Sequence, residues 1–197
     1  MYIIIIKFKY INVILLYLMV HILIFMKIIT TPMCEEIVKL AGITDYIVDK
    51  FPDNQSGDLA IVLSESDVKM DSIAIKLNTA SQIFQSIKRI SYISDNPLDD
   101  GEIESFFDNY NLCKKYLNSD FKRNVNVKVY SKFLKDIILD VGFNIVDKDY
   151  DYVIYPDYLK NEVVEGSNLV EILSHNSISK NPFEKAESRY SILETLI

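Results

Sequence analysis

Short apolar runs alternate along the chain with longer stretches in which apolar residues recur at helical spacing. The short runs are rich in β-branched residues and are bounded by Asp, Asn, Gly and Ser, which is typical of strands. We predict strands at residues 28–30, 45–49, 59–66, 73–77, 126–131, 143–147, 150–158 and 168–173. The run at 59–66, LAIVLSES, has no polar alternation in its first half, which indicates a strand covered on both faces.

The stretches with helical spacing carry start and stop signals. Thr31 can cap a first helix with Pro32 in its first position, and Gly42 ends it. Thr79 can cap a second helix. The predicted helices cover residues 32–41, 80–93, 97–117, 132–141 and 182–197. Strands that alternate with helices in this way predict an α/β fold with a mostly parallel, Rossmann-like sheet flanked by helices.

Two parts of the chain resemble each other at a spacing of 100 residues. IITTPMCEEIVKLAGI aligns with VKVYSKFLKDIILDVGF, so that Thr31 matches Ser131 and Gly42 matches Gly142. Each part is followed by a strand that an Asp introduces, Asp58 in one and Asp151 in the other. The pattern fits two β-α-β halves with a helical connection over 94–124, and it equally fits the generic form of such units. We expect residues 26–197 to form a single α/β domain.

The first 25 residues form a hydrophobic leader. Residues 10–26 reach the lower limit of about 17 residues for spanning a bilayer. Small residues that would mark a signal cleavage site are missing from HILIFMKIITTP. A strand at Ile28 leaves no linker behind an anchor, and Met26 is a natural translation start. We therefore expect a non-native extension, with a membrane anchor as the alternative, and a cytoplasmic protein unless the anchor is native.

Charge argues against nucleic-acid binding. The formal net charge is −7, and Lys7 and Lys9 are the only charged residues before Met26, so the folded part is more acidic still. Such a body repels phosphate backbones unless it carries a local basic patch. The densest basic points are the pairs 88–89, 114–115 and 122–123, and acidic or neutral residues flank each of them.

The sequence lacks the familiar motifs of catalysis and cofactor binding. Its five glycines form no phosphate-binding loop, and its two cysteines and two histidines match no metal-site spacing. We predict no catalytic residue and no metal site, and no cofactor can be named. Cys34 in the first helical turn could be a reactive thiol, or a small core residue. His175 lies in a polar loop without an evident partner.

Hydroxyl and amide side chains follow the predicted strands. They are Thr30-Thr31, Ser64-Glu65-Ser66, Asn78-Thr79, Tyr130-Ser131 and Tyr155-Pro156-Asp157. In open α/β sheets, ligands bind beyond the carboxyl ends of the strands, and helix N-termini there favour anions. We predict ligand contacts at Thr31, Ser64, Thr79 and Ser131. The alternative is that these side chains simply cap helices.

Residues 28–63 resemble the first β-α-β unit of cobalamin- and siderophore-type substrate-binding proteins and of nitrogenase-like lobes. The likeness rests on the strand followed by Thr-Pro, the acidic first helical turn, Gly42, DYIV and DLAIVLS. That family has two full lobes joined by a long helix, for which this chain looks too short. The chain as a whole resembles small archaeal proteins found in methanogens.

Three functional hypotheses follow. The first is a non-catalytic α/β module that binds a small polar or anionic ligand or a protein partner. The second is a thiol-dependent enzyme that uses Cys34. The third is a membrane-tethered interaction protein held by residues 10–26.

Overall fold

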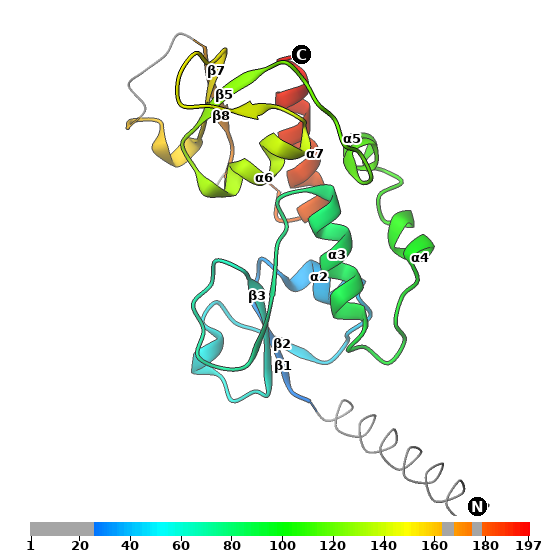
Figure 1. Ribbon diagram of the computed structural model, residues 1–197. Coiled ribbons are helices and arrows are strands. Elements are labelled where there is room, and N and C mark those ends of the chain that lie inside the picture. The colour runs from blue at the N-terminus through cyan, green and yellow to red at the C-terminus, as the bar shows by residue number, and fades with distance from the viewer. Residues whose placement is uncertain (1–25, 163–167, 175–178) are drawn as a thin grey trace, which may run out of the picture. The chain divides into compact units, whose positions relative to one another are not determined.

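A computed structural model describes residues 26–162, 168–174 and 179–197 (Figure 1). The predicted hydrophobic leader and His175 lie outside these residues. The elements in chain order are β1 (Ile28–Thr30), α2 (Glu35–Leu40), β2 (Tyr46–Val48), η1 (Pro52–Asn54), β3 (Leu59–Leu63), β4 (Ser72–Ile75), α3 (Ala80–Ser91), α4 (Asp100–Ser105), α5 (Asn111–Tyr116), β5 (Asn126–Val129), α6 (Lys132–Asp140), β6 (Asn144–Ile145), β7 (Tyr152–Pro156), η2 (Asp157–Leu159), β8 (Leu169–Ile172) and α7 (Pro182–Glu194). Among the described helices, none has both the length and the apolarity that crossing a bilayer requires.

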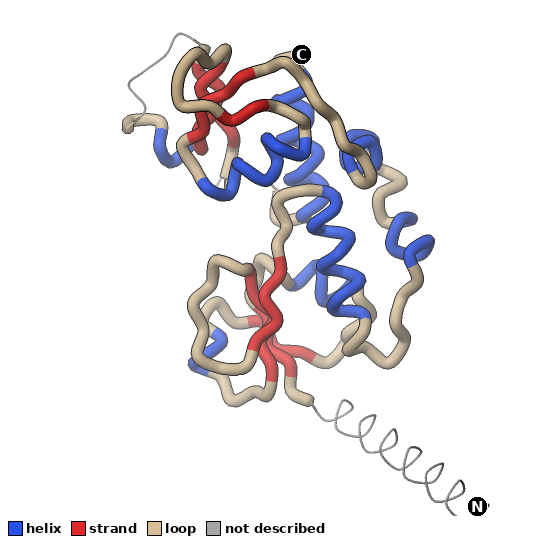
Figure 2. Tube along the Cα trace, viewed as in Figure 1, coloured by secondary structure: helices blue, strands red, loops and turns tan. Residues whose placement is uncertain are grey.

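The strands form two four-stranded sheets (Figure 2). The first has the order β2-β1-β3-β4 and the second the order β6-β5-β7-β8. β1 runs parallel to β2 and β3, and β5 runs parallel to β6 and β7. The predicted α/β fold with parallel sheets and flanking helices is therefore confirmed, in the form with two halves.

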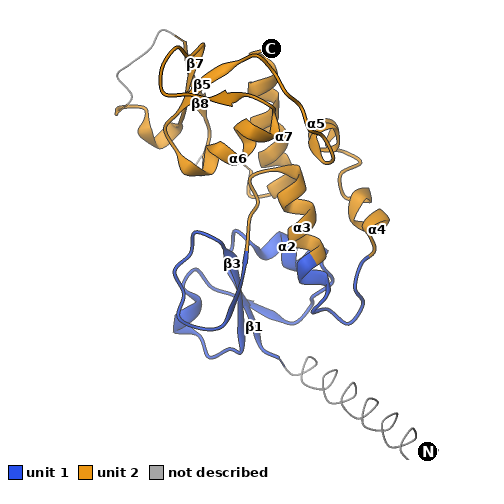
Figure 3. Cartoon of the chain, viewed as in Figure 1, with its two compact units in different colours: residues 1–74, 89–98 blue, residues 75–88, 99–197 orange. Residues whose placement is uncertain are grey.

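The chain divides into two compact units (Figure 3). Among the described residues, unit 1 holds the first sheet and comprises those up to residue 74 and 89–98, and unit 2 comprises 75–88 and those from residue 99 on. The expectation that the chain is too short for two lobes is wrong, because the sheet of each unit consists of only four short strands. Whether the units unfold as the single domain predicted for 26–197 stays a prediction.

The two β-α-β halves end their helices in the same way. Gly42 and Gly142 have φ angles of +83° and +88°, which is the left-handed region that glycine reaches without strain. The Gly42 N–H donates to the Lys39 carbonyl, and the Ile43 N–H donates to that of Val38. The corresponding bonds from Gly142 and Phe143 run to Leu139 and Ile138. Each helix thus closes with a Schellman motif.

The strand-introducing aspartates also match. The Asp58 carboxylate accepts a 2.8 Å bond from the Lys27 N–H, and its own N–H donates to the Lys27 carbonyl. Asp151 makes the same reciprocal pair of bonds with Asn126. In each half the aspartate joins the start of the first strand to the start of the strand beside it, which sets their register.

The structure corrects two predicted helices. The stretch 97–117 is broken into α4 and α5. Asp99 and Glu102 build a capping box that starts α4. α5 begins anew where the Glu187 carboxylate on α7 accepts the N–H groups of Leu112 and Cys113. The first helix begins at Glu35, with residues 32–34 in turns before it. The Thr31 carbonyl accepts from the Cys34 and Glu35 N–H groups at that turn.

Candidate functional site

A cavity of about 260 Å³ lies in unit 1, beyond the carboxyl ends of three strands. Thr31 follows β1, the segment 50–54 follows β2, and the segment 66–68 follows β3. All of these residues line the cavity. Its volume equals that of roughly nine liquid waters, which suits a small ligand. The predicted concentration of polar groups at the carboxyl edge is thus present within this sheet.

Thr31 lines this cavity, and its side chain does not cap α2. The residue at the N-cap position is Cys34, and no side chain caps this helix. The predicted capping role of Thr31 is therefore wrong. Its hydroxyl hydrogen-bonds to the Cys34 thiol and keeps further capacity to donate or accept.

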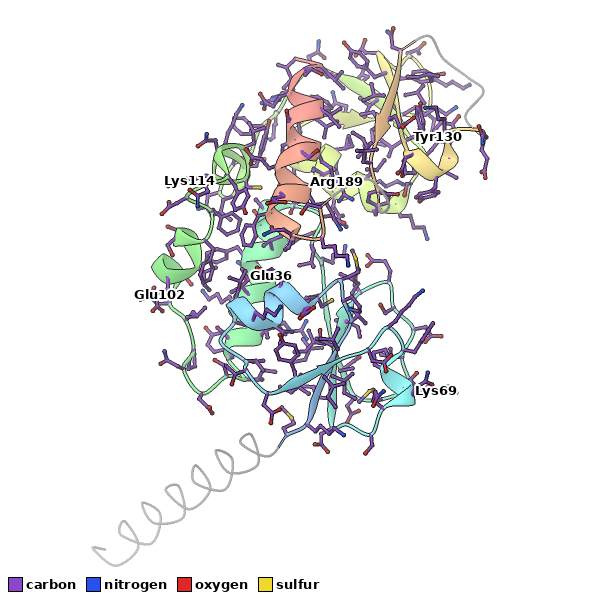
Figure 4. The ribbon with its side chains drawn as sticks, turned by 180° about the vertical axis from the view of Figure 1, so that it is seen from behind. Glu36, Lys69, Glu102, Lys114, Tyr130 and Arg189 are labelled. Atoms are coloured by element: carbon purple, nitrogen blue, oxygen red, sulfur yellow. The ribbon has the colours of Figure 1, made fainter. Side chains whose placement is uncertain are left out.

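A fixed loop forms the wall of the cavity after β2. The Asp53 carboxylate accepts bonds from the Lys69 N–H, at 2.9 and 3.1 Å, and from the Met70 N–H at 3.1 Å. Figure 4 shows Lys69 beside the short helix η1. Phe51 is 59% exposed, and the Lys50 ammonium lies 5.4 Å from its ring centre. The wall therefore offers one cation and one exposed aromatic face, and the lining of the cavity also holds the carboxylates of Asp53 and Asp67.

Ser64, the second predicted contact, does not line this cavity. It is exposed, and its hydroxyl donates to the Glu65 carboxylate at 2.8 Å. Ser66, two residues further on, takes the place in the lining. The prediction missed this shift because β3 ends at Leu63 and a turn follows, closed by the Ser66 N–H on the Leu63 carbonyl.

Ser131 occupies the equivalent of the Thr31 position at the carboxyl edge of the second sheet. It is half-buried and stands at the N-cap position of α6, yet its side chain makes no capping bond. Its hydroxyl lies 3.4 Å from the Tyr158 hydroxyl, and Tyr158 is 56% exposed. Capping therefore does not account for the hydroxyl at either matched position.

A network with one buried guanidinium ties the ends of β7 and β8 together. The Asp157 carboxylate accepts from the hydroxyl of Ser174 and, at 3.1 Å, from its N–H. Arg189 of α7 donates to the carbonyls of Leu173 and Ser174 at 3.4 and 3.5 Å. Its guanidinium lies 5.0 Å from the Phe133 ring centre. Figure 4 shows the place of Arg189 on α7. Burial lowers the pKa of Arg189 to about 10, although Asp157 opposes the shift.

Lys185 stands one helical turn before Arg189. It is 7% exposed, and its backbone N–H donates to the Asn181 carbonyl at 3.1 Å. Its ammonium group has no hydrogen bond or ion pair with the described residues. Burial, with a smaller contribution from the Arg189 charge, lowers its pKa to about 8. Two buried cations thus share one helix face beside one carboxylate.

Thr79 belongs to a different cavity, of about 350 Å³, in unit 2. Its hydroxyl caps α3 by accepting from the Gln82 N–H at 3.2 Å. The lining includes the carboxylates of Asp120, Asp136 and Asp140, which would repel an anion. Asp136 is already hydrogen-bonded by the side chains of Lys76, Asn78 and Gln82. The capping interpretation therefore suffices for Thr79.

The environment of Cys34 does not suit a reactive thiol. The residue is fully buried, and burial raises its pKa to about 11. Cys113 is also fully buried, and its pKa is raised as well, with Glu187 adding to the effect of burial. A nucleophilic cysteine needs a lowered pKa and access to solvent. Within the described residues, no group of His, Cys, Asp and Glu side chains could hold a metal ion.

Sequence reasoning missed the buried cations of α7. Lys185 and Arg189 fall into the same stripe as Phe183, Ala186 and Tyr190, which are buried as well. Two like charges four residues apart on an apolar stripe of a helix repel each other. This spacing is the signal in the sequence by which the two buried cations could have been found.

No protein-family model matches the chain, and no curated protein matches it either. Among solved structures, the chain is similar to the periplasmic vitamin B12 binding protein BtuF of Vibrio cholerae. That match has 10% identity and a TM-score of 0.48, over 86% of this chain and 94% of the other. The chain is also similar to a Zn(II)-bound mutant variant of AdcAII from Streptococcus pneumoniae, with 12% identity and a TM-score of 0.42, over 86% and 97% of the two chains. Both similarities extend over most of the chain, whereas the predicted resemblance covers residues 28–63.

Proposed function

We propose that this chain is a binding module without chemistry of its own. Its ligand is a small polar or anionic molecule, or a polar group of a protein partner, held at the carboxyl edge of the first sheet. Thr31 and Ser66 supply hydrogen bonds, Lys50 supplies charge, and Phe51 supplies an apolar face. The methanogen-type origin and the cytoplasmic location remain part of this proposal.

One observation carries the proposal. The cavity brings together segments that follow three neighbouring strands, and Thr31, one of its lining residues, has a hydroxyl that does not cap a helix. Ligand pockets in open α/β sheets lie at this edge, with a few polar groups in fixed positions. The bonds from the Lys69 and Met70 N–H groups to Asp53 hold the wall before any ligand arrives.

The test begins with native mass spectrometry of the full chain as purified, to detect a copurifying molecule. Thermal unfolding is then followed with inorganic phosphate, citrate, glutamate and glucose as probes. We expect at least one probe, or the copurifying molecule, to raise Tm in a saturable way. Thr31→Val should weaken that binding about three- to tenfold, the effect of one lost hydrogen bond.

Ser64→Ala is the matched control, because Ser64 is an exposed hydroxyl just outside the cavity. Its affinity should equal that of the parent chain. Equal affinity of Thr31→Val and the parent for every molecule that binds would refute the assignment of the cavity.

The two rival hypotheses have separate tests. Labelling of Cys34 by a thiol reagent in the folded state should be slow up to about pH 10, because its pKa is raised to about 11; fast labelling near neutral pH would revive the thiol-dependent enzyme. Sequencing of the native N-terminus decides the tethered form, which requires residues 10–26.

A further inference from the structure

The buried cations of α7 call for a negative partner. Lys185 and Arg189 are 7% and 4% exposed, and both are in unit 2. Burial of an unpaired charge costs several kcal/mol of folding free energy, so proteins usually pair a buried charge or leave it in solvent. Arg189 is stabilised by hydrogen bonds to two backbone carbonyls and by the negative charge of Asp157. Lys185 has no such partner among the described residues.

Simple packing of the lysine stem does not explain Lys185. A lysine that covers apolar surface normally keeps its ammonium group in water. An exposure of 7% for the whole residue leaves little of the ammonium group in water. The ammonium is not sealed off, however. In the part of the chain that the structure describes, Nη1 of Arg123 is the one buried side-chain nitrogen without a partner. The Lys185 ammonium therefore keeps some contact with solvent.

The local charges favour a monoanion. Lys185 and Arg189 contribute two positive charges, and the Asp157 carboxylate acts on the Arg189 guanidinium. Both cations are on α7, a helix of 13 residues with Lys185 in the turn after its N-cap Asn181, where the helix dipole adds positive potential. The Glu184 side chain is exposed. One negative charge balances the remaining excess.

The geometry points to a carboxylate-binding site at this place, in which Lys185 and the free N–H donors of Arg189 receive the carboxylate of a small organic acid. Of the five guanidinium donors, Nε–H and one Nη2–H are used by the carbonyls of Leu173 and Ser174. The Ser174 hydroxyl is already committed to Asp157. The site is independent of the cavity in unit 1, so Thr31→Val should not affect it.

The test titrates the full chain with acetate, benzoate and inorganic phosphate at constant ionic strength, with sodium chloride as the balancing salt. Tm and the NMR shift of the Lys185 side chain are followed. We expect saturable binding of the two carboxylates and weaker binding of phosphate. Lys185→Met should lower carboxylate affinity at least tenfold, and Lys185→Arg should retain it within about threefold.

Lys114→Met is the control, because Lys114 is an exposed lysine of unit 2 paired with Asp108. It should bind as the parent chain does. Absence of saturable binding by either carboxylate overturns the inference. Tighter binding of phosphate, or unchanged carboxylate affinity of a folded Lys185→Met chain, overturns it as well.

Discussion

At the residue scale, the two matched glycines have the same backbone conformation but different surroundings. A Cβ at Gly142 would lie 2.2 Å from the carbonyl oxygen of Phe121. A Cβ at Gly42 would meet nothing closer than the Ser94 hydroxyl at 3.7 Å. The shared φ angle explains why both positions are glycine. The close backbone neighbour adds a second reason at Gly142.

We expect Gly42→Ala to lower the free energy of unfolding by about 1–2 kcal/mol, the cost of a left-handed alanine. Gly142→Ala carries the same cost plus a backbone clash, so we expect a loss of about 3 kcal/mol or more. Urea denaturation of both variants checks the difference. Equal losses would show that the segment around Phe121 moves aside freely.

At the element scale, Glu194 joins α7 to α5 and to the segment before β5. Lys115 donates to its carboxylate at 2.8 Å, Arg123 donates at 3.2 Å, and the Tyr116 hydroxyl donates as well. Burial alone would raise the pKa of Glu194, but these bonds lower it to about 2. The carboxylate is thus favoured in the folded state.

The pH dependence follows from that shift. Because the folded pKa lies below the unfolded value, the stabilisation is present above about pH 4.5 and is lost as the pH falls through about 2. We expect Glu194→Gln to cost about 1–2 kcal/mol at pH 7, after allowance for solvent screening, and little near pH 2. Unfolding at both pH values, with Glu162→Gln as an exposed control, measures it. A loss that does not shrink in acid would contradict the assignment.

Local sequence patterns predicted those helices and strands whose start and stop signals lie in or next to the element itself. β1 and the start of α7, with the Asn181 cap and Pro182, occur where the sequence placed them. The break between α4 and α5 could not be predicted in this way, because the Glu187 carboxylate that starts α5 comes from 74 or more residues further along the chain. The same limit applies to the candidate sites. Thr31 was found from its place after a strand, whereas the burial of Lys185 depends on tertiary packing.

At the scale of the whole molecule, the two halves share strand order, helix ending and strand-start aspartate. These details go beyond the generic β-α-β pattern, and they favour the hypothesis of a duplicated half. The spacing of 100 residues that aligns Gly42 with Gly142 also aligns Thr31 with Ser131, the two hydroxyls that do not cap helices.

The path of the chain between the units predicts a single unfolding transition. The chain passes from one unit to the other after residues 74, 88 and 98. Loss of either unit therefore releases both ends of a segment that belongs to the other. We expect one calorimetric peak with equal calorimetric and van't Hoff enthalpies. Two resolved peaks would contradict the predicted single domain for 26–197.

The same threading has a consequence for dissecting this protein. Because residues 89–98 belong to the unit that residues 26–74 build, no single cut of the polypeptide yields two self-sufficient fragments. A fragment that ends at residue 74 lacks residues 89–98 of its own unit. A fragment that begins at residue 75 contains residues 89–98 but lacks the rest of the unit to which they belong. A version of the first unit that keeps both of its segments is a fusion in which a short artificial linker replaces residues 75–88.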